Sequence, residues 1–180
     1  MSKVSGNLLF LFKKRVIEKR GMQFYQRLVE STDDDVQKIL SDTIFSQQYY
    51  PVKVFKQGLQ ALMDLTSKEE IISEAEYKAE YQLHKFFGLV KKILSIDFAL
   101  KHINTLWQKN YTSGHIEVLN NEEGYYKIRI DDYEWGEAQL IGFEAYLRKA
   151  AELLTKKKCR SSRARTDERT TYIEVRCLDT

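Results

Sequence analysis

The histidines, cysteines and glycines are the residues that could build a catalytic or metal site here. His84, His102 and His115 lack the four-residue spacing that directs two imidazoles from one helix face to a metal, and no Cys-x-x-Cys is present. The sequence also lacks Gly-x-Gly-x-x-Gly, a phosphate-binding loop ending in Lys-Ser or Lys-Thr, and Gly-x-Ser-x-Gly. We therefore predict no metal site, no catalytic residues and a non-enzymatic protein.

Two further pairs of residues could do chemistry. Asp131 and Asp132 could act as acid and base, but we favour the interpretation that they belong to the polar loop between a strand and a helix. Cys159 and Cys177 are equidistant from Glu168, so a symmetrical hairpin would make them cross-strand partners. A redox switch is one alternative; two reduced thiols are the expectation in a reducing compartment, and the sequence does not decide whether they pair.

The hairpin around Glu168 is basic over residues 156–169. Its cations outnumber Asp167 and Glu168, which would suit phosphate binding to nucleic acid or anionic lipid. Basic side chains on a sheet edge also prevent aggregation between edges, and we favour that role. The cations are Lys156, Lys157, Lys158, Arg160, Arg163, Arg165 and Arg169.

Aromatic and aliphatic side chains supply the remaining candidate site, an apolar pocket between helices and sheet. Ordinary core packing is the competing role for each of them. Its predicted lining is Tyr50, Phe86, Phe87, Val90, Ile103, Trp107, Phe143 and Tyr146.

The composition is that of one folded domain. The chain has 180 residues, 43% of them hydrophobic, and a formal net charge of +3, which is too evenly mixed to require a nucleic acid or an anionic membrane. No secretory signal and no apolar stretch long enough to cross a membrane is visible, so we expect a cytoplasmic protein.

The elements that must position these residues change character near residue 111. Apolar residues recur at helical spacing up to that point, and the long central helix should carry Glu74 and Lys78 on its wet side. Val4 should open the first helix, and Pro51 should be the first helical residue of the fourth. The expected helices cover 4–20, 22–30, 33–40, 51–65, 67–94 and 97–111.

In the last third of the chain, the spacing of apolar residues predicts two hairpins with a helix between them. Apolar residues alternate over 116–118 and 126–130, with a turn at 120–124. Helical spacing returns over 137–155, and two more strands follow over 158–165 and 170–177. We predict an α+β fold in a single domain, 1–180: a helical part of five to six helices (1–111), followed by a β-β-α-β-β part (112–180) with a four-stranded antiparallel sheet.

The chain resembles an uncharacterised bacterial family that is abundant in myxobacteria. The matching segments are Val4-Ser5-Gly6, Arg20-Gly21, Tyr49-Tyr50-Pro51, and Leu106 to Tyr111 followed by Gly114. That family is similar in turn to the superfamily of haem nitric-oxide-binding domains, 4-vinyl reductase domains and small subunits of the Golgi transport particle (TRAPP). The resemblance implies an α+β ligand-holding domain, often dimeric, with an apolar or tetrapyrrole-like guest.

The chain departs from the haem-binding branch. In that branch a Tyr-x-Ser-x-Arg triad holds the haem propionates. The corresponding segment of this chain, Ile130 to Trp135, contains neither Ser nor Arg. The segment from Tyr111 to His115 is similar to the triad, but it precedes the first strand of the sheet and ends in His. His102 has the general location of an iron ligand without those partners. The cysteine signature of the 4-vinyl reductase branch is not cleanly present. We expect no haem, and no other cofactor beyond a co-purifying lipid or similar apolar ligand.

These observations lead to two functional hypotheses. The first is a sensor or signalling adaptor that holds a small hydrophobic molecule and acts as a homodimer. The alternative is a protein-protein scaffold or tether, resembling the TRAPP small subunits, that holds no ligand.

Overall fold

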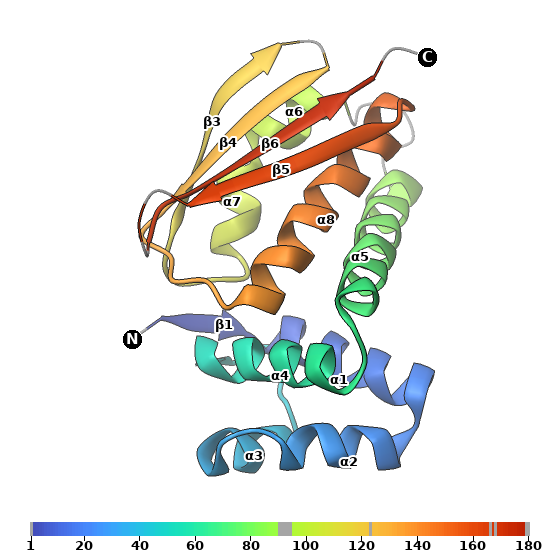
Figure 1. Ribbon diagram of the computed structural model, residues 1–180, viewed down its shortest axis with the longest axis vertical. Coiled ribbons are helices and arrows are strands. Elements are labelled where there is room, and N and C mark those ends of the chain that lie inside the picture. The colour runs from blue at the N-terminus through green and yellow to red at the C-terminus, as the bar shows by residue number, and fades with distance from the viewer. Residues whose placement is uncertain (1, 90–94, 123, 166, 168, 179–180) are drawn as a thin grey trace.

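The computed structural model describes residues 2–89, 95–122, 124–165, 167 and 169–178. Side chains are described for the same residues except 84–89 and 165. Within these ranges the front part of the chain is helical and the back part contains the main sheet, as predicted (Figure 1).

Seven helices precede the main sheet in the described part of the chain. Ser5 caps the first by accepting a hydrogen bond from the Leu8 amide, and Asp34 and Asp35 place negative charge in the first turn of the third. The helices are α1 (Gly6–Arg20), α2 (Met22–Glu30), α3 (Asp34–Ser41), α4 (Val52–Leu65), α5 (Lys68–Leu89), α6 (Ile96–Lys101) and α7 (Ile103–Gln108).

A short ribbon of two strands replaces two predicted helix starts. Strand β1 (Lys3–Ser5) pairs antiparallel with β2 (Tyr49–Pro51), so Val4 is a strand residue and Pro51 caps α4 rather than opening it. Because Gly6 has no side chain, the carbonyl oxygen of Phe45 can lie against the start of α1; a Cβ at this position would collide with that oxygen. The apolar residues from Val4 onward recur at helical spacing, so the sequence did not predict this ribbon.

Two boundaries farther along also differ from the prediction. The helix expected over 97–111 is two helices that meet at His102. The turn expected at 120–124 is shorter, because the first strand continues through an irregularity between Val118 and Asn120 and ends at Glu122.

Four antiparallel strands form the main sheet, in the order β3-β4-β6-β5. The pairing of β4 with β6 joins two hairpins that are far apart in the sequence. The strands are β3 (His115–Glu122), β4 (Tyr125–Asp131), β5 (Cys159–Arg165) and β6 (Thr171–Cys177), and α8 (Glu137–Thr155) connects the hairpins. The predicted fold class is confirmed.

The molecule is layered (Figure 1). Helices α6, α7 and α8 lie on one face of the sheet, and α5 packs against α8. Helices α1 to α4 form the other end of the molecule. Strand β4 alternates accordingly: Tyr126, Ile128 and Ile130 are buried, while Lys127 on the other face pairs with Glu174 at 2.9 Å.

The contact between α5 and α8 is close. A Cβ added at Gly142 of α8 would lie 3.4 Å from Ile71 and 3.8 Å from Ala75 of α5. The small residue therefore lets the two helices approach, which brings the side chains at the border of this contact together. Among the described residues, we find no helix with the length and apolarity that a membrane crossing demands.

Candidate functional site

The structure brings together three of the eight predicted pocket residues. The ring centroids of Trp107 and Phe143 are 5.4 Å apart, and those of Phe143 and Tyr146 are 6.4 Å apart. Ile103 lies on α7, as Trp107 does, and is partly buried against the core. The side chains of Phe86 and Phe87, and residue Val90, lie outside the described residues.

Tyr50 lies elsewhere, in the ribbon of β1 and β2. Its hydroxyl accepts a hydrogen bond from the Phe45 amide at 2.9 Å, and its ring lies 2.9 Å from where a Cβ of Gly6 would be. The side chain thus packs the start of α1, apart from the aromatic residues on α7 and α8.

Five aromatic side chains form what we call the tryptophan cluster: Trp107, Tyr111, Tyr133, Trp135 and Phe143. Trp107 is its centre, with ring centroids at 4.2 Å from Tyr111, 4.9 Å from Tyr133 and 5.7 Å from Trp135. Its indole nitrogen donates to the Ser113 carbonyl at 2.9 Å. The rings pack against one another, as side chains in a hydrophobic core do.

A buried amide links the tyrosines of the tryptophan cluster. Gln139 Nε2 donates to the Tyr133 hydroxyl at 2.6 Å and contacts the Tyr111 hydroxyl at 3.5 Å. Burial raises the pKa of Tyr111 to about 12, and burial also holds the pKa of Tyr133 well above its usual value. Gln139 Oε1 is buried and has no hydrogen-bond partner among the described residues.

Sequence reasoning missed four of these residues: Tyr111, Tyr133, Trp135 and Gln139. The available signal was the i, i+2 spacing of Tyr133 and Trp135 in a segment that we interpreted as loop. Both side chains are buried.

A second group of side chains lies where α5 meets α8, and we call it the lysine site: Lys78, Gln82, Phe143 and Tyr146. The Lys78 ammonium lies 5.8 Å from the Tyr146 ring centroid, and the Tyr146 hydroxyl donates to Gln82 Oε1 at 2.8 Å. Burial lowers the pKa of Lys78 to about 8 and raises that of Tyr146 to about 12.

The prediction that Glu74 and Lys78 lie on the wet side of α5 is wrong for both, because each side chain is partly buried. Lys78 is partly buried at the α8 contact, and Glu74 binds Arg15 at 3.0 Å and Lys19 at 2.8 Å instead. The carboxylate of Glu74 is paired with cations of α1. The sequence alone did not show that α1 would pack there.

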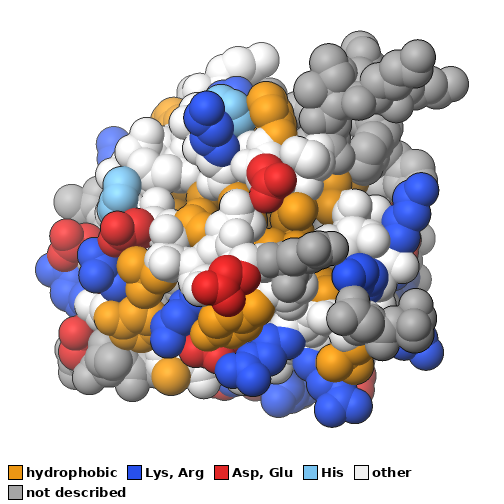
Figure 2. Space-filling model, turned by 90° about the horizontal axis from the view of Figure 1, so that it is seen from above, with side chains coloured by type: hydrophobic (Ala, Val, Ile, Leu, Met, Phe, Trp, Pro, Cys, Tyr) orange, Lys and Arg blue, Asp and Glu red, His pale blue; other side chains and the backbone are white. Residues whose placement is uncertain are grey.

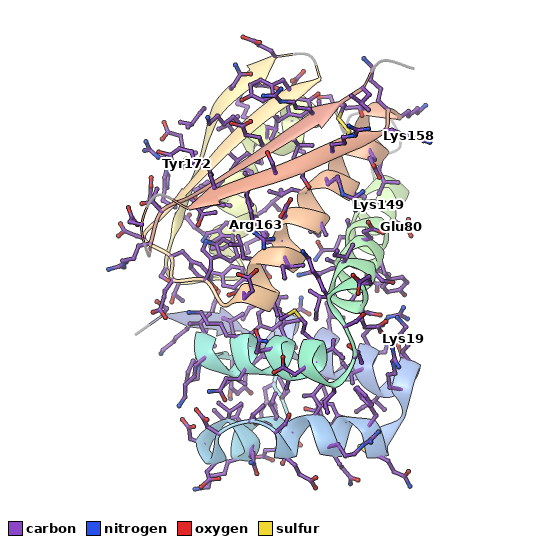
Figure 3. The ribbon with its side chains drawn as sticks, viewed as in Figure 1. Lys19, Glu80, Lys149, Lys158, Arg163 and Tyr172 are labelled. Atoms are coloured by element: carbon purple, nitrogen blue, oxygen red, sulfur yellow. A yellow bond between two sulfur atoms is a disulfide. The ribbon has the colours of Figure 1, made fainter. Side chains whose placement is uncertain are left out.

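Ion pairs flank the lysine site. Lys149 of α8 and Glu80 of α5 point toward each other and lie 2.8 Å apart (Figure 3). Arg148 of α8 likewise pairs with Glu76 of α5. The carboxylates along this side of α5 are therefore already neutralised by other cations.

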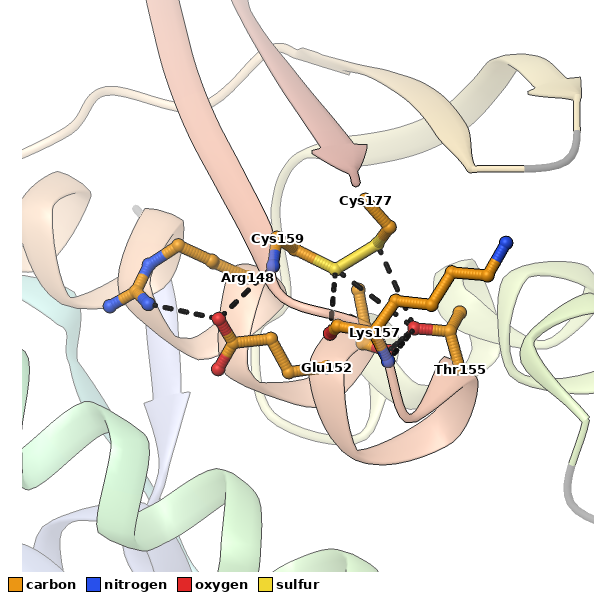
Figure 4. Close-up of a disulfide and its surroundings, with 7 residues drawn as sticks. Arg148, Glu152, Thr155, Lys157, Cys159 and Cys177 are labelled. Carbon is orange, nitrogen blue, oxygen red and sulfur yellow. Dashed lines mark hydrogen bonds and ion pairs between the residues drawn. A yellow bond between two sulfur atoms is a disulfide. The ribbon is translucent and has the colours of Figure 1, made fainter. Parts of the chain in front are cut away.

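Cys159 and Cys177 form a disulfide, so the expectation of two reduced thiols is wrong (Figure 4). They are register partners at the end of the β5-β6 hairpin, as its symmetry about Glu168 suggested, with Cα atoms 3.9 Å apart. The Thr155 hydroxyl at the end of α8 lies 3.8 Å from the Cys177 sulfur. The expectation failed because it rested on cellular compartment and not on the geometry of the hairpin.

The basic hairpin is partly neutralised. Arg163 binds Glu144 at 2.8 Å and Glu137 at 2.7 Å, both on α8 (Figure 3). An open surface depression of about 480 Å³ lies beside the disulfide. It is lined by Glu152, Lys156, Lys157, Lys158, Cys159, Arg160 and Leu178.

The paired carboxylates occupy the corner after β4. Asp131 ends the strand and accepts from Arg129 Nε at 2.8 Å, and Asp132 has the left-handed φ of 54° typical of a turn. In the part of the chain that the structure describes, no group of three or more His, Cys, Asp or Glu side chains is arranged to hold a metal ion.

Haem is the cofactor that the family resemblance raises, and the residues present can be tested against it. The His102 ring packs against Phe98 with the ring planes tilted by 52° and the centroids 4.4 Å apart, and Phe98 is 46% exposed. Where the haem-binding branch holds the propionates, Tyr133 and Trp135 point into the tryptophan cluster, and the segment contributes no Ser or Arg. These residues do not fit a haem.

Comparison with known proteins finds likeness in fold without likeness in sequence. No protein-family model matches the chain, and no curated protein matches it. Solved structures match over nearly their whole length. The Fe(II) unliganded H-NOX protein from K. algicida is 13% identical, with 98% of this chain and 97% of that chain covered and a TM-score of 0.73.

Two further structures agree. The Fe(II)NO form of an H-NOX protein from S. oneidensis is 14% identical, with 97% of this chain and 99% of that chain covered and a TM-score of 0.68. A single-site mutant of the T. tengcongensis H-NOX is 8% identical, with 97% of this chain and 98% of that chain covered and a TM-score of 0.68. The chain therefore has an H-NOX-like fold, which is the haem nitric-oxide-binding side of the resemblance seen in its sequence.

Proposed function

We propose that this chain is a non-enzymatic ligand-binding sensor or signalling adaptor, and that it holds a small hydrophobic molecule between its helices and its sheet. The observation that carries the proposal is the partly exposed apolar surface beside α8. Phe143 and Tyr146 of α8 and Ile103 of α7 are packed against the core but are not closed off by it. Covering such surface would contribute about 25 cal/mol for each Å² buried.

The fold supports the same proposal. Its solved neighbours include an H-NOX protein from S. oneidensis in the Fe(II)NO ligation state, so a protein of this fold can hold a ligand. Because the residues present here do not fit a haem, the guest we propose is an apolar molecule without iron.

The test is to identify what the native protein carries. Protein purified without denaturation is weighed by native mass spectrometry, extracted with organic solvent, and the extract identified. We expect a bound apolar molecule in native spectra that is absent from denatured spectra. A native mass equal to the chain alone, with an empty extract, would contradict the proposal.

Paired variants locate the guest. Tyr146→Ala removes a ring that borders the proposed site, so the liganded fraction should fall. Tyr81→Ala, at a tyrosine of α5 that is 47% exposed, should leave that fraction unchanged. Equal loss in both variants would place the guest elsewhere or indicate damage to the fold.

The scaffold or tether is the second candidate, and the tryptophan cluster favours it. Mutual contacts among Trp107, Tyr111 and Tyr133 leave these rings without a role in holding a guest. A domain with such an interior can act through its surface alone. An empty extract in the experiment described above, from ligand-free protein that still binds another protein, is the result that would support this candidate.

Signalling as a homodimer belongs to the first candidate. Phe98, Leu106 and Leu119 are exposed on α6, α7 and β3, which contact one another. Seen from the end of the molecule where α6 lies, hydrophobic side chains show among the charged ones (Figure 2). Light scattering over a concentration series should give the dimer mass, and Phe98→Asp should shift it toward the monomer; a constant monomer mass would contradict dimerisation.

A further inference from the structure

Lys78 is a partly buried cation with no anion beside it among the described residues. The ring of Tyr146, at 5.8 Å, is its partner in that part of the chain. A ring face attracts an ammonium group, but less strongly than a carboxylate at hydrogen-bond distance does. A charge held this way keeps most of the cost of its removal from water.

The described acidic side chains of the surrounding elements are already paired with other cations. On α5, Glu74 is bound by Arg15 and Lys19 of α1. Glu76 and Glu80 are bound by Arg148 and Lys149 of α8. Residues 84–95 that follow along the chain contain no Asp or Glu at all. Consistent with this, burial is the sole cause of the lowered pKa of Lys78.

A hydrogen-bond donor accompanies the amine. Gln82 lies one helical turn after Lys78, and its Oε1 accepts from the Tyr146 hydroxyl, which orients the amide. Its Nε2 donates no hydrogen bond within the described residues. One ammonium and one amide donor on the same side of α5, next to the apolar rings of Phe143 and Tyr146, match the two parts of an amphiphile.

We propose that the lysine site binds the carboxylate of an apolar monocarboxylic acid, with Lys78 as its counter-ion, Gln82 as a second donor and the aromatic rings of α8 against its hydrocarbon part. The inference rests on the proposed function: it names the ligand class and places the guest where α5 meets α8. The carboxylate supplies the missing negative charge, and the apolar part covers the partly exposed rings.

Dodecanoate and 1-dodecanol are the probes, because they share a hydrocarbon chain and differ in charge. Calorimetric titration of the wild type at pH 7 should show dodecanoate binding more tightly than the alcohol. Lys78→Met should lower the affinity for dodecanoate about ten- to hundredfold and leave that for dodecanol unchanged. Lys68→Met, at an exposed lysine of the same helix, should alter neither.

The pH profile is a second readout that does not depend on a variant. Because the free amine has a pKa of about 8, wild-type affinity for dodecanoate should be constant between about pH 6 and pH 8, where the carboxyl group of the probe is ionised, and fall by up to tenfold for each pH unit above pH 8. Affinity for dodecanol should not change over that range.

The outcomes separate the two proposals. Equal affinity of the wild type for both probes, or no effect of Lys78→Met, would overturn the role of Lys78 while an apolar site remained. Failure of the wild type to bind either probe would overturn the carboxylate assignment, and the extraction experiment would then decide whether an apolar guest of another class exists.

Discussion

The tryptophan cluster and the lysine site lie side by side along α8 and share Phe143, yet they differ in how their polar groups are satisfied. In the cluster, the rings contact one another, and the Trp107 nitrogen and both tyrosine hydroxyls have partners, so that among these groups only the neutral Gln139 Oε1 lacks one in the described residues. In the lysine site, a cation faces a ring and an amide donor has no acceptor among the described residues.

This difference teaches that aromatic content alone does not locate a ligand site. Both regions are rich in rings, but only the lysine site holds a charge whose counter-ion is absent from the described residues. A closed cluster should respond to substitution as a core does, by losing stability. An open site should respond as a functional site does, by gaining stability when its uncompensated group is removed.

Trp107→Ala should give the largest effect and test whether the cluster is core. Removing a 4% exposed indole that contacts four other rings should lower the free energy of unfolding by about 3–5 kcal/mol. Phe98→Ala, at a 46% exposed ring, should cost less than about 1 kcal/mol. Urea denaturation measures both, and equal losses would remove the distinction between core and surface rings.

Gly114→Ala tests the closeness of the cluster with a single methyl group. Gly114 has φ +83°, and a Cβ there would lie 3.0 Å from Tyr133 Cβ and 3.1 Å from the Trp107 nitrogen. We expect a loss of about 2–4 kcal/mol from backbone strain and overpacking together.

Gly21→Ala is the matched control for that prediction. Gly21 has φ +84°, and nothing lies within 4 Å of the place that its Cβ would take. Only the backbone cost of about 1–3 kcal/mol should remain, because φ 84° with ψ 166° is a conformation that essentially glycine alone adopts. If the two alanine variants lose the same stability, the space around Gly114 is not filled as described.

Lys78→Met should act in the opposite direction and stabilise the protein. The pKa of Lys78 is about 8 in the folded protein, against 10.5 for the ordinary side chain. The folded state therefore binds fewer protons than the unfolded state between these values, so wild-type stability rises with pH through this window. The cost of the charge is fully present below pH 8.

The variant should accordingly be more stable than the wild type by about 2–3 kcal/mol at pH 7, a figure reduced for the partial exposure of the side chain. The difference should shrink from pH 8 to pH 10.5. Urea denaturation at several pH values measures it, and Lys68→Met should follow the wild-type curve. Parallel curves for Lys78→Met and the wild type would show that the amine is solvated.

The sequence was sufficient for the parts of the fold that depend on local periodicity. The alternation in β4 follows from neighbouring side chains along one strand, and the cross-strand placement of Cys159 and Cys177 follows from their equal distance from Glu168. It was insufficient where distant segments decide. Val4 forms a strand because Tyr50 pairs with it, which no periodicity around Val4 contains.

The candidate site shows the same limit. Trp107, Phe143 and Tyr146 were found because aromatic residues on one helix face are visible in the sequence. Lys78 was assigned to solvent, because it lies on the polar side of a helix whose apolar residues form the opposite face. Its burial comes from the packing of α5 against α8, a contact between segments that are far apart in the sequence.

Tyr146→Phe is the smallest expected change and examines the border between the two regions. It keeps the ring that faces Lys78 and removes the hydroxyl that donates to Gln82 at 2.8 Å. Loss of one partly buried hydrogen bond should cost about 0.5–1.5 kcal/mol in urea denaturation. Tyr172→Phe, on the outer face of the sheet, should cost less, because no hydrogen bond of its hydroxyl is found in the described residues. Since the ring at position 146 persists, the lowered pKa of Lys78 should remain near 8 in NMR titration of its side chain; a return to 10.5 would mean that the hydroxyl, and not burial, sets the environment of the amine.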